Sequence, residues 1–183
     1  MSMQPILAFA GRMGAGKSSV SAAVANDLGW KFASFGGFVR KTATSRSVEH
    51  TRESLQAIGE ELEANDPGMF CRAVLNDAGW NPDEPAVVEG IRHVRIWETL
   101  KNLVAPQPIF LVYLEAPEDL RRTRLQERGA QEANYLDRAE AHSTERDVIT
   151  ELPQLANIAL STEGRSVPEL VQHIKANLPL NGS

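Results

Sequence analysis

Residues 11–18, close to the N-terminus, constrain the fold of this chain more than any other segment. Their sequence, GRMGAGKS, fits the pattern G-x-x-x-x-G-K-[ST] of a P-loop. An apolar run at 6–10 precedes the segment, and apolar residues at helical spacing follow it as far as Gly29, as expected for a strand, a loop and a helix. In such a loop the backbone N–H groups converge on phosphate oxygens, Lys17 reaches the outer phosphates, and the Ser18 hydroxyl ligates Mg²⁺. A plain glycine-rich turn would leave Lys17 unexplained.

Length and charge limit the class of protein. The chain has 183 residues, 42% of them hydrophobic, which is enough for one domain with a full core. A net charge of −5 does not fit nucleic-acid binding through a basic surface, so small molecules are the expected partners. No leader pattern is present and no run approaches the roughly 18 apolar residues of a membrane span, so we expect a cytoplasmic protein without membrane contact. The single cysteine, Cys71, excludes an internal disulfide and is interpreted as a small buried helix residue.

Short β-like runs alternate with helical segments along the chain. This alternation predicts an α/β fold with a parallel sheet. The first, third and fourth runs are almost entirely apolar, as strands covered on both faces are, so they should form the centre of the sheet. The expected strands are 6–10, 31–35, 86–89, 109–114 and 157–161, and the expected helices are 17–28, 51–64, 69–78, 117–128 and 167–177, the last with a capping box of Ser166 and Glu169.

Two long polar intervals, 36–84 and 129–151, do not belong to this alternating core. The first should hold two or more helices that project beyond the sheet. Insertions beside the carboxyl ends of parallel strands lie over the ligand crevice, so we interpret 36–84 as an acceptor-binding arm and 129–151 as a lid. The alternative is that both intervals are surface helices without a role in binding.

An acid and an arginine end the third predicted strand, in the sequence VVEGIR. Glu89 comes at the end of the apolar run and Arg92 lies just beyond a glycine. Beside a P-loop, Glu89 would face the magnesium ion through water and Arg92 would hold an anionic group of the second substrate. The alternative is a surface ion pair that contributes little.

Arginines are concentrated in the 117–128 helix and in the interval after it. Arg124 and Arg128 are four residues apart and share one helix face. One guanidinium would stack on a purine and the other would bind phosphate. Arg138 and Arg146 fall in the predicted lid, where cations would neutralise a transferring phosphoryl group and closure would exclude water. The alternative is a solvated charged helix.

Further candidates lie in the predicted arm. Arg40 follows two glycines that permit close approach of a ligand, and it would bind the phosphate of the acceptor unless it is simply solvated. The segment 55–59 would line the acceptor pocket or form an ordinary amphipathic helix. The histidines are scattered without ligand spacing, so none is assigned to a metal: His50, His93, His142 and His173.

Taken together, these segments resemble the nucleoside monophosphate kinase superfamily and the related dephospho-coenzyme-A kinases. The P-loop matches strongly, and 89–92 is similar to the Asp-Gly-x-x-Arg segment of that family, with Glu in place of Asp. Arg124 and Arg128 resemble the R-x-x-x-R pair before the lid, and 157–164 resembles the last strand and the adenine-side loop. The resemblance implies a P-loop three-layer α/β/α sandwich whose five-stranded parallel sheet has the order 2-3-1-4-5.

The resemblance also implies roles for single residues. Lys17, Arg92, Arg128 and Arg138 would act in catalysis, Arg40, Glu89 and Arg92 would bind the acceptor, and Ser18 and Glu89 would hold Mg²⁺. ATP would be bound by Gly11, Met13, Gly14, Ala15, Gly16, Lys17, Ser18, Ser19, Arg124 and Gly164.

The expected function is transfer of the γ-phosphoryl group of ATP to a nucleoside or deoxynucleoside monophosphate. Two alternatives stay open at this point. One is a kinase that acts on a hydroxyl group, such as that of dephospho-coenzyme A or another small metabolite, for which a general base would be needed. The other is a nucleotide-binding regulatory ATPase. The sequence identifies neither the base and sugar of the acceptor nor the oligomeric state.

Overall fold

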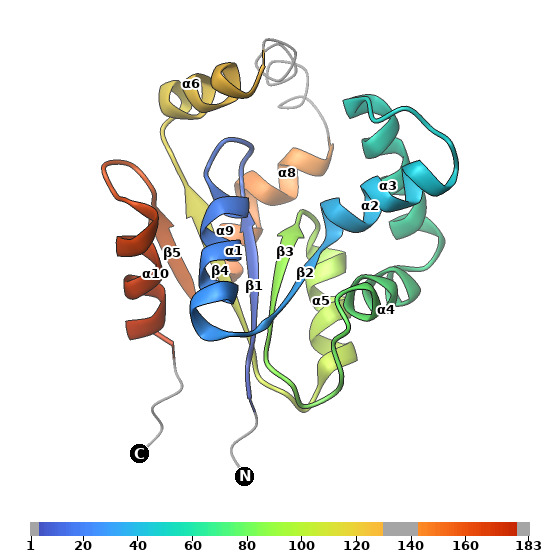
Figure 1. Cartoon of the computed structure of the whole chain (residues 1–183), viewed down its shortest axis with the longest axis horizontal. Helices are drawn as coiled ribbons and strands as arrows, with labels where there is room; N and C mark the ends of the chain where they lie inside the picture. Colours follow the sequence, from blue (N-terminus) through green and yellow to red (C-terminus); the bar gives the residue numbers. More distant parts are fainter. Residues whose placement is uncertain (1–3, 130–142, 179–183) are drawn as a thin grey trace.

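A computed structural model describes residues 4–129 and 143–178 of the chain. Its centre is a single sheet of five parallel strands in the order β2-β3-β1-β4-β5 (Figure 1). The predicted α/β fold and strand order are therefore confirmed. The strands are β1 (Ile6–Gly11), β2 (Lys31–Ser34), β3 (Ala86–Ile91), β4 (Ile109–Glu115) and β5 (Ile158–Ser161).

The sheet is most deeply buried at its middle, as the apolar runs predict. Every residue of β1 is buried, and Ile6 lies in register with Ala86 of β3 on one side and with Ile109 of β4 on the other. Strands of this kind cannot expose a face to water without losing the free energy of apolar burial, so helices must cover both faces.

Helices form a layer on each face of the sheet (Figure 1). On one face, α1 and α10 pack against each other and against the strands through one apolar cluster. On the other face, a second cluster joins the sheet to α4, α5, α8 and α9. The helices of the two layers are α1 (Lys17–Leu28), α10 (Val167–Ala176), α4 (Pro67–Asp77), α5 (Val94–Val104), α8 (Ser143–Thr150) and α9 (Leu152–Leu155).

Local sequence signals set the ends of several helices. Gly29 ends α1 with a left-handed φ of 66°, and its N–H reaches back to the carbonyls of Ala25 and Asn26. At the start of α10, Ser166 and Glu169 form the capping box that the sequence predicts. Helices α1 and α10 are thus fixed at ends that can be recognised before the structure is known.

Three helices connect β2 to β3, in agreement with the expectation of two or more: α2 (Phe35–Ser45), α3 (Arg52–Asn65) and α4. Helices α2 and α3 extend beyond the sheet on the side of its carboxyl ends (Figure 1). The predicted strand 31–35 is one residue too long, because Ser34 accepts a hydrogen bond from the N–H of Gly37 and starts α2 at Phe35.

Helix α5 was not among the predicted helices. Its buried residues Ile96, Trp97, Leu100 and Val104 recur at helical spacing, so the signal was present. Cys71 is buried in α4, as interpreted from the sequence. Within the described ranges, no helix has both the length and the apolar character needed to span a membrane.

Candidate active site

The P-loop connects β1 to α1 at the carboxyl edge of the sheet. Two of its glycines are required by close contacts: a Cβ on Gly11 would lie 2.1 Å from the carbonyl oxygen of Leu114, and one on Gly14 would lie 2.8 Å from the carbonyl oxygen of Arg121. Gly16 is the N-cap of α1 and has a left-handed φ of 89°. The loop therefore presents the first N–H groups of α1 and the positive end of that helix to one point, which is an arrangement that binds phosphate.

Lys17 is held at the base of this loop. Its side chain is almost completely buried, with 7% exposure, and Nζ donates a hydrogen bond of 3.0 Å to the carbonyl oxygen of Arg12. Both Lys17 and Ser18 line the cavity that opens beside the loop. The ammonium group is thus fixed close to the loop, where it could neutralise phosphate charge.

Arg121, on α6 (Glu118–Arg128), supports the loop from inside the protein, a role that sequence reasoning missed. Its side chain is 1% exposed and Nη1 donates to the carbonyl oxygen of Met13 at 3.3 Å. The available signal was spacing, since Arg121 lies four residues before the fully buried Leu125 and so shares its helix face. The two arginines selected for binding, Arg124 and Arg128, lie on the same helix.

Arg124 links the P-loop to the segment after β5. Its Nη1 donates to the carbonyl oxygen of Gly14 at 3.2 Å and to Oγ1 of Thr162 at 2.9 Å. The Thr162 hydroxyl in turn donates to the carbonyl oxygen of Ala15 at 3.0 Å. In this structure Arg124 therefore fixes the loop, and it also lines a second cavity of about 290 Å³.

That second cavity lies on the α10 side of the loop. Its polar lining includes Ser19, Arg124, Arg128, Thr162 and Arg165. The backbone there turns at Gly164, which has a φ of 65°. The sequence-predicted residues Ser19 and Arg124 are therefore brought together with the 162–166 segment that was expected on the adenine side.

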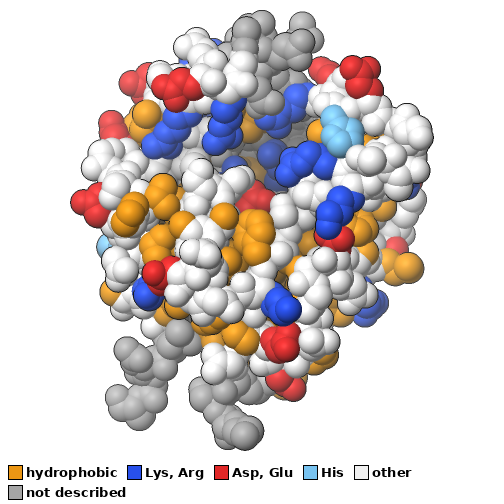
Figure 2. Space-filling view, in the orientation of Figure 1, with side chains coloured by type: hydrophobic (Ala, Val, Ile, Leu, Met, Phe, Trp, Pro, Cys, Tyr) orange, Lys and Arg blue, Asp and Glu red, His pale blue; other side chains and the backbone are white. Residues whose placement is uncertain are grey.

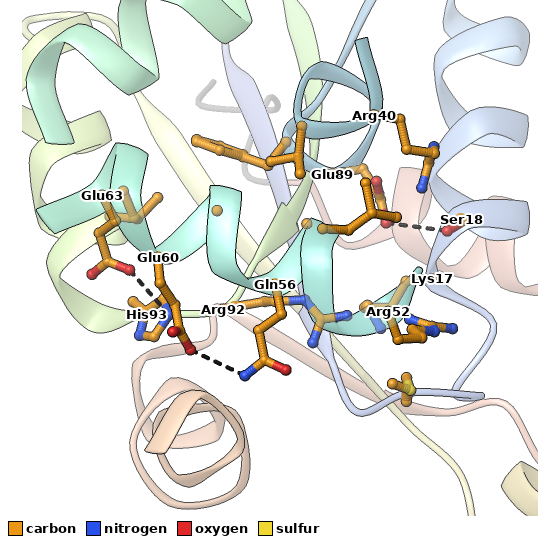
Figure 3. Close-up of a pocket in the computed structure, with 18 of the residues that line it drawn as sticks. Lys17, Ser18, Arg40, Arg52, Gln56, Glu60, Glu63, Glu89, Arg92 and His93 are labelled. Carbon is orange, nitrogen blue, oxygen red and sulfur yellow. Dashed lines mark hydrogen bonds and ion pairs between the residues drawn. The ribbon is translucent and has the colours of Figure 1, made fainter. Parts of the chain in front are cut away.

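Glu89 ends up at the centre of a small hydrogen-bond network on the opposite side of the loop. Its Oε1 accepts from the hydroxyl of Ser18 at 3.1 Å (Figure 3). Its Oε2 accepts from the hydroxyl of Ser34 at 2.9 Å. The carboxylate is buried, so these hydroxyls replace water around it. Oxygen atoms of this kind are the ligands that Mg²⁺ prefers, and Ser18 and Glu89 therefore fit a hydrated magnesium ion.

The larger cavity, of about 310 Å³, opens between the P-loop, α2 and α3. Figure 2 shows Lys and Arg side chains around the hollow between α6 and α3. The sequence-predicted Arg40, Glu89, Arg92 and Arg128 all line this cavity, together with Lys17. Arg128 and Gly16 line the second cavity as well, so the two cavities meet at the loop.

Several residues of the large cavity were not singled out from the sequence. Arg52 at the start of α3 lies near Lys17, whereas Glu60, Glu63 and His93 lie at the other end (Figure 3). His93 bridges two elements, because its Nε2 is 3.0 Å from Oε2 of Glu63 and its Nδ1 is 3.7 Å from Oδ2 of Asp147. Burial raises the pKa of Glu63, and electrostatic interactions with His93 and Arg95 oppose that shift.

The predicted lid is only partly within the described residues. Arg138 lies outside them. Arg146 is on α8 and is exposed, and it is not among the described residues that line either cavity. Two residues further along, Val148 is buried in the core and its carbonyl oxygen accepts from the hydroxyl of Tyr113 at 2.8 Å. This end of the 129–151 interval is therefore packed against the sheet.

In the part of the chain that the structure describes, no group of three or more His, Cys, Asp or Glu side chains is placed to hold a metal ion. Nε2 of His50 is hydrogen-bonded to the hydroxyl of Thr44 at 2.9 Å, and His93 lies between two carboxylates.

A family model described as "AAA domain" matches residues 7–145, which include the P-loop, β3 and α6. The chain belongs to the AAA domain family. The chain is also similar to a UPF0200 protein of Aeropyrum pernix, with 31% identity over 67% of the chain and 64% of that protein. A UPF0200 protein of Methanothrix thermoacetophila is 30% identical over 70% of the chain and 69% of that protein. The chain thus spans slightly less than two thirds of the first of these relatives.

Solved structures share the whole architecture of this AAA domain protein at low sequence identity. A gluconokinase from Sinorhizobium meliloti has a TM-score of 0.57 at 18% identity, covering 97% of this chain and 93% of that one. Shikimate kinase from Acinetobacter baumannii, in complex with shikimate, has a TM-score of 0.59 at 20% identity, covering 94% of this chain and 91% of that one. The APS kinase of Mycobacterium tuberculosis, in complex with AMPPNP and APS, has a TM-score of 0.58 at 17% identity, covering 97% of this chain and 99% of that one. These likenesses establish the P-loop kinase fold.

Proposed function

We propose that this protein is an ATP-dependent phosphotransferase that transfers the γ-phosphoryl group to the phosphate of a nucleoside or deoxynucleoside monophosphate. One observation carries the proposal: two cavities meet at Gly16 of the P-loop, and the larger one is lined by several arginines in addition to Lys17. The smaller cavity suits the nucleoside of the donor, and the larger one suits the acceptor.

The donor half rests on the P-loop and its supports. Gly16 and the N-terminus of α1 supply N–H groups for the phosphates, and Lys17 supplies a charge next to them. The bonds from Arg121 and Arg124 to the carbonyl groups of Met13 and Gly14 keep the loop in this shape before ATP arrives. Catalysis by positioning benefits from such preorganisation, because the loop does not have to reorganise in the transition state.

The acceptor half is marked by its charge. Among the residues that the structure describes, five cationic side chains line the larger cavity, against three carboxylates. A cavity of this kind favours an anionic ligand, and arginine binds the oxygens of a phosphate in a bidentate manner. The cationic residues are Lys17, Arg40, Arg52, Arg92 and Arg128, and the carboxylates belong to Glu60, Glu63 and Glu89.

A phosphate acceptor also agrees with the hydrogen bonds that Glu89 makes. An ionised phosphate oxygen can attack the γ-phosphorus directly, forming a new P–O bond while the bond to the β–γ bridging oxygen breaks and ADP leaves, so no general base is needed. Glu89 holds the hydroxyls of Ser18 and Ser34 rather than standing alone in the cavity. Bound magnesium would neutralise charge on the donor phosphates, and Ser18 with Glu89 would hold it.

The second candidate is transfer to a hydroxyl group, as in dephospho-coenzyme A or another small metabolite. It is favoured by one observation, namely that Glu89 lies in the same cavity as Lys17 and could accept a proton from an alcohol. The two candidates differ in the acceptor that they require, so they can be separated by experiment.

The experiment is ADP release from ATP and Mg²⁺ with separate acceptors: nucleoside monophosphates, dephospho-coenzyme A, small alcohols, and none. The proposal predicts release that depends on a monophosphate. Release that depends on dephospho-coenzyme A or an alcohol would establish the second candidate instead. Slow release that no acceptor changes, together with tight ATP binding, would indicate the regulatory ATPase.

A further inference from the structure

One face of α3 forms a wall of the acceptor cavity along almost the whole length of the helix. The lining residues follow one another at alternating steps of three and one, which is the spacing of a single helix face. They are Arg52, Leu55, Gln56, Gly59, Glu60 and Glu63. Whatever occupies the cavity therefore lies alongside α3, and the order of side chains on this face decides what each part of the ligand meets.

The polarity of this face changes from one end to the other. Arg52, at the N-terminal end, lies at the same end of the cavity as Lys17, whereas Glu60 and Glu63 lie at the far end with His93 (Figure 3). Glu63 lies eleven positions after Arg52, which corresponds to about 16 Å along the helix axis. The cavity therefore has a cationic end at the P-loop and, away from the P-loop, an end rich in hydrogen-bond acceptors.

The acceptor groups at the far end are held in place. Oε2 of Glu63 lies 3.0 Å from Nε2 of His93, and the Glu63 side chain is only 14% exposed. Oε1 of Glu60 accepts from Nε2 of Gln56 at 3.0 Å. His93 is fixed in its turn by Asp147, whose Oδ2 also accepts from the N–H of Val94 at 3.1 Å. Two oriented carboxylates on one wall are a feature that selects between ligands, because each rejects a carbonyl oxygen placed against it.

We propose that Glu60 and Glu63 select an acceptor whose end remote from the phosphate carries an amino group, so that cytosine, adenine or guanine nucleotides are preferred over those of uracil and thymine. This proposal rests on the proposed function. Cytosine, adenine and guanine each present an exocyclic NH₂ group to a carboxylate. Uracil and thymine present two carbonyl oxygens that flank a single N–H, and those oxygens would face the negative charge.

The test compares kcat/KM for CMP, AMP, GMP, UMP and dTMP in the wild-type protein and in Glu60→Gln and Glu63→Gln. Each variant keeps the shape of the side chain and replaces one acceptor oxygen by a donor, which can bond to a carbonyl group of the base. Glu61→Gln is the matched control, since Glu61 lies on the same helix, is 47% exposed and pairs with Arg46. Thermal unfolding of all four proteins verifies that each is folded.

We expect kcat/KM for the best amino-bearing nucleotide to exceed the values for both UMP and dTMP by about tenfold or more, because a site built to accept hydrogen bonds discriminates against a ligand that presents carbonyl oxygens instead. This ratio should shrink in Glu60→Gln or Glu63→Gln and stay unchanged in Glu61→Gln. Efficient turnover of UMP or dTMP by the wild type, or a ratio that neither cavity variant alters, would overturn the inference and leave the proposed function standing. Failure of all five nucleotides as acceptors would overturn the proposed function itself.

Discussion

The hydroxyl of Ser34 donates a hydrogen bond of 2.9 Å to Oε2 of Glu89 and so joins the end of β2 to the end of β3. The same oxygen of Ser34 accepts from the N–H of Gly37 and caps α2. Because Ser18 donates to the other oxygen of Glu89, one carboxylate connects the P-loop helix, the third strand and the start of the acceptor arm. Changes at this point should affect both folding and turnover.

Ser34→Ala should lower the free energy of unfolding by about 1–2 kcal/mol, because it removes a helix cap and one partner of a buried carboxylate. It should also lower kcat, since Glu89 loses a bond that orients it. Chemical denaturation and ADP release measure the two effects. Ser45→Ala is the control at the other, exposed end of α2, where the hydroxyl donates to the carbonyl oxygen of Thr42. Equal behaviour of the two variants would contradict this role for Ser34.

Gly14→Ala should abolish most ATP binding and destabilise the fold. A Cβ at this position would lie 2.8 Å from the carbonyl oxygen of Arg121, and the φ of +77° is unfavourable for alanine. Gly29→Ala is the matched control, because its φ of +66° carries a similar strain of about 1 kcal/mol but nothing lies within 4 Å of the added atom. Calorimetric titration with ATP should show weak binding only for Gly14→Ala. Normal ATP affinity in Gly14→Ala would contradict the prediction, because it would show that the P-loop still binds ATP after the added Cβ has displaced its backbone.

Arg40→Ala should raise the KM for the monophosphate acceptor by about ten- to a hundredfold, the usual effect of losing a hydrogen bond between charged groups. The KM for ATP should change little, because Arg40 lines only the larger of the two cavities described. Arg46→Ala, just beyond the end of the same helix, removes an exposed partner of Glu61 and serves as the control. An effect on ATP equal to that on the acceptor would place Arg40 outside the acceptor site.

Cys71 should react with thiol reagents only when the protein unfolds. Burial raises the pKa of its thiol from 9.0 to about 12, so the reactive thiolate is absent from the folded state at neutral pH. The raised pKa stabilises the fold below pH 9, and this contribution is lost as the pH rises from 9 towards 12, where only the unfolded chain ionises readily. Labelling rates at pH 8 should therefore follow the unfolding equilibrium in urea, and fast labelling without urea would contradict the burial of Cys71.

The backbone of the site could be predicted from the sequence because its signals are local. Gly16 and Gly29 set both ends of α1, and the apolar runs that become β1, β3 and β4 identify the strands covered on both faces. The positions of Arg40, Arg92 and Arg128 around one cavity were expected from the P-loop and from a family resemblance, since periodicity alone does not bring together residues from α2, from α6 and from the segment that follows β3.

The remaining features depend on contacts between distant segments. The sequence does not distinguish Arg121 from the adjacent Arg122. Arg121 is buried beneath the P-loop, whereas Arg122 pairs with Glu118 at the surface. Likewise, nothing near Glu63 in the chain reveals that it meets His93, which lies thirty residues later by their numbers. Such residues acquire their roles only when the helices pack.

The most direct test of the proposed function is to follow the γ-phosphoryl group itself. ATP labelled at the γ-phosphate is incubated with Mg²⁺ and a mixture of nucleoside monophosphates, and the labelled products are separated. We predict label in a nucleoside diphosphate with the wild-type protein, and a rate lower by about two orders of magnitude or more for Lys17→Ala, which loses the charge beside the P-loop but keeps its fold. Label found only in inorganic phosphate or dephospho-coenzyme A supplied in parallel, or an unchanged rate in Lys17→Ala, would contradict the proposal.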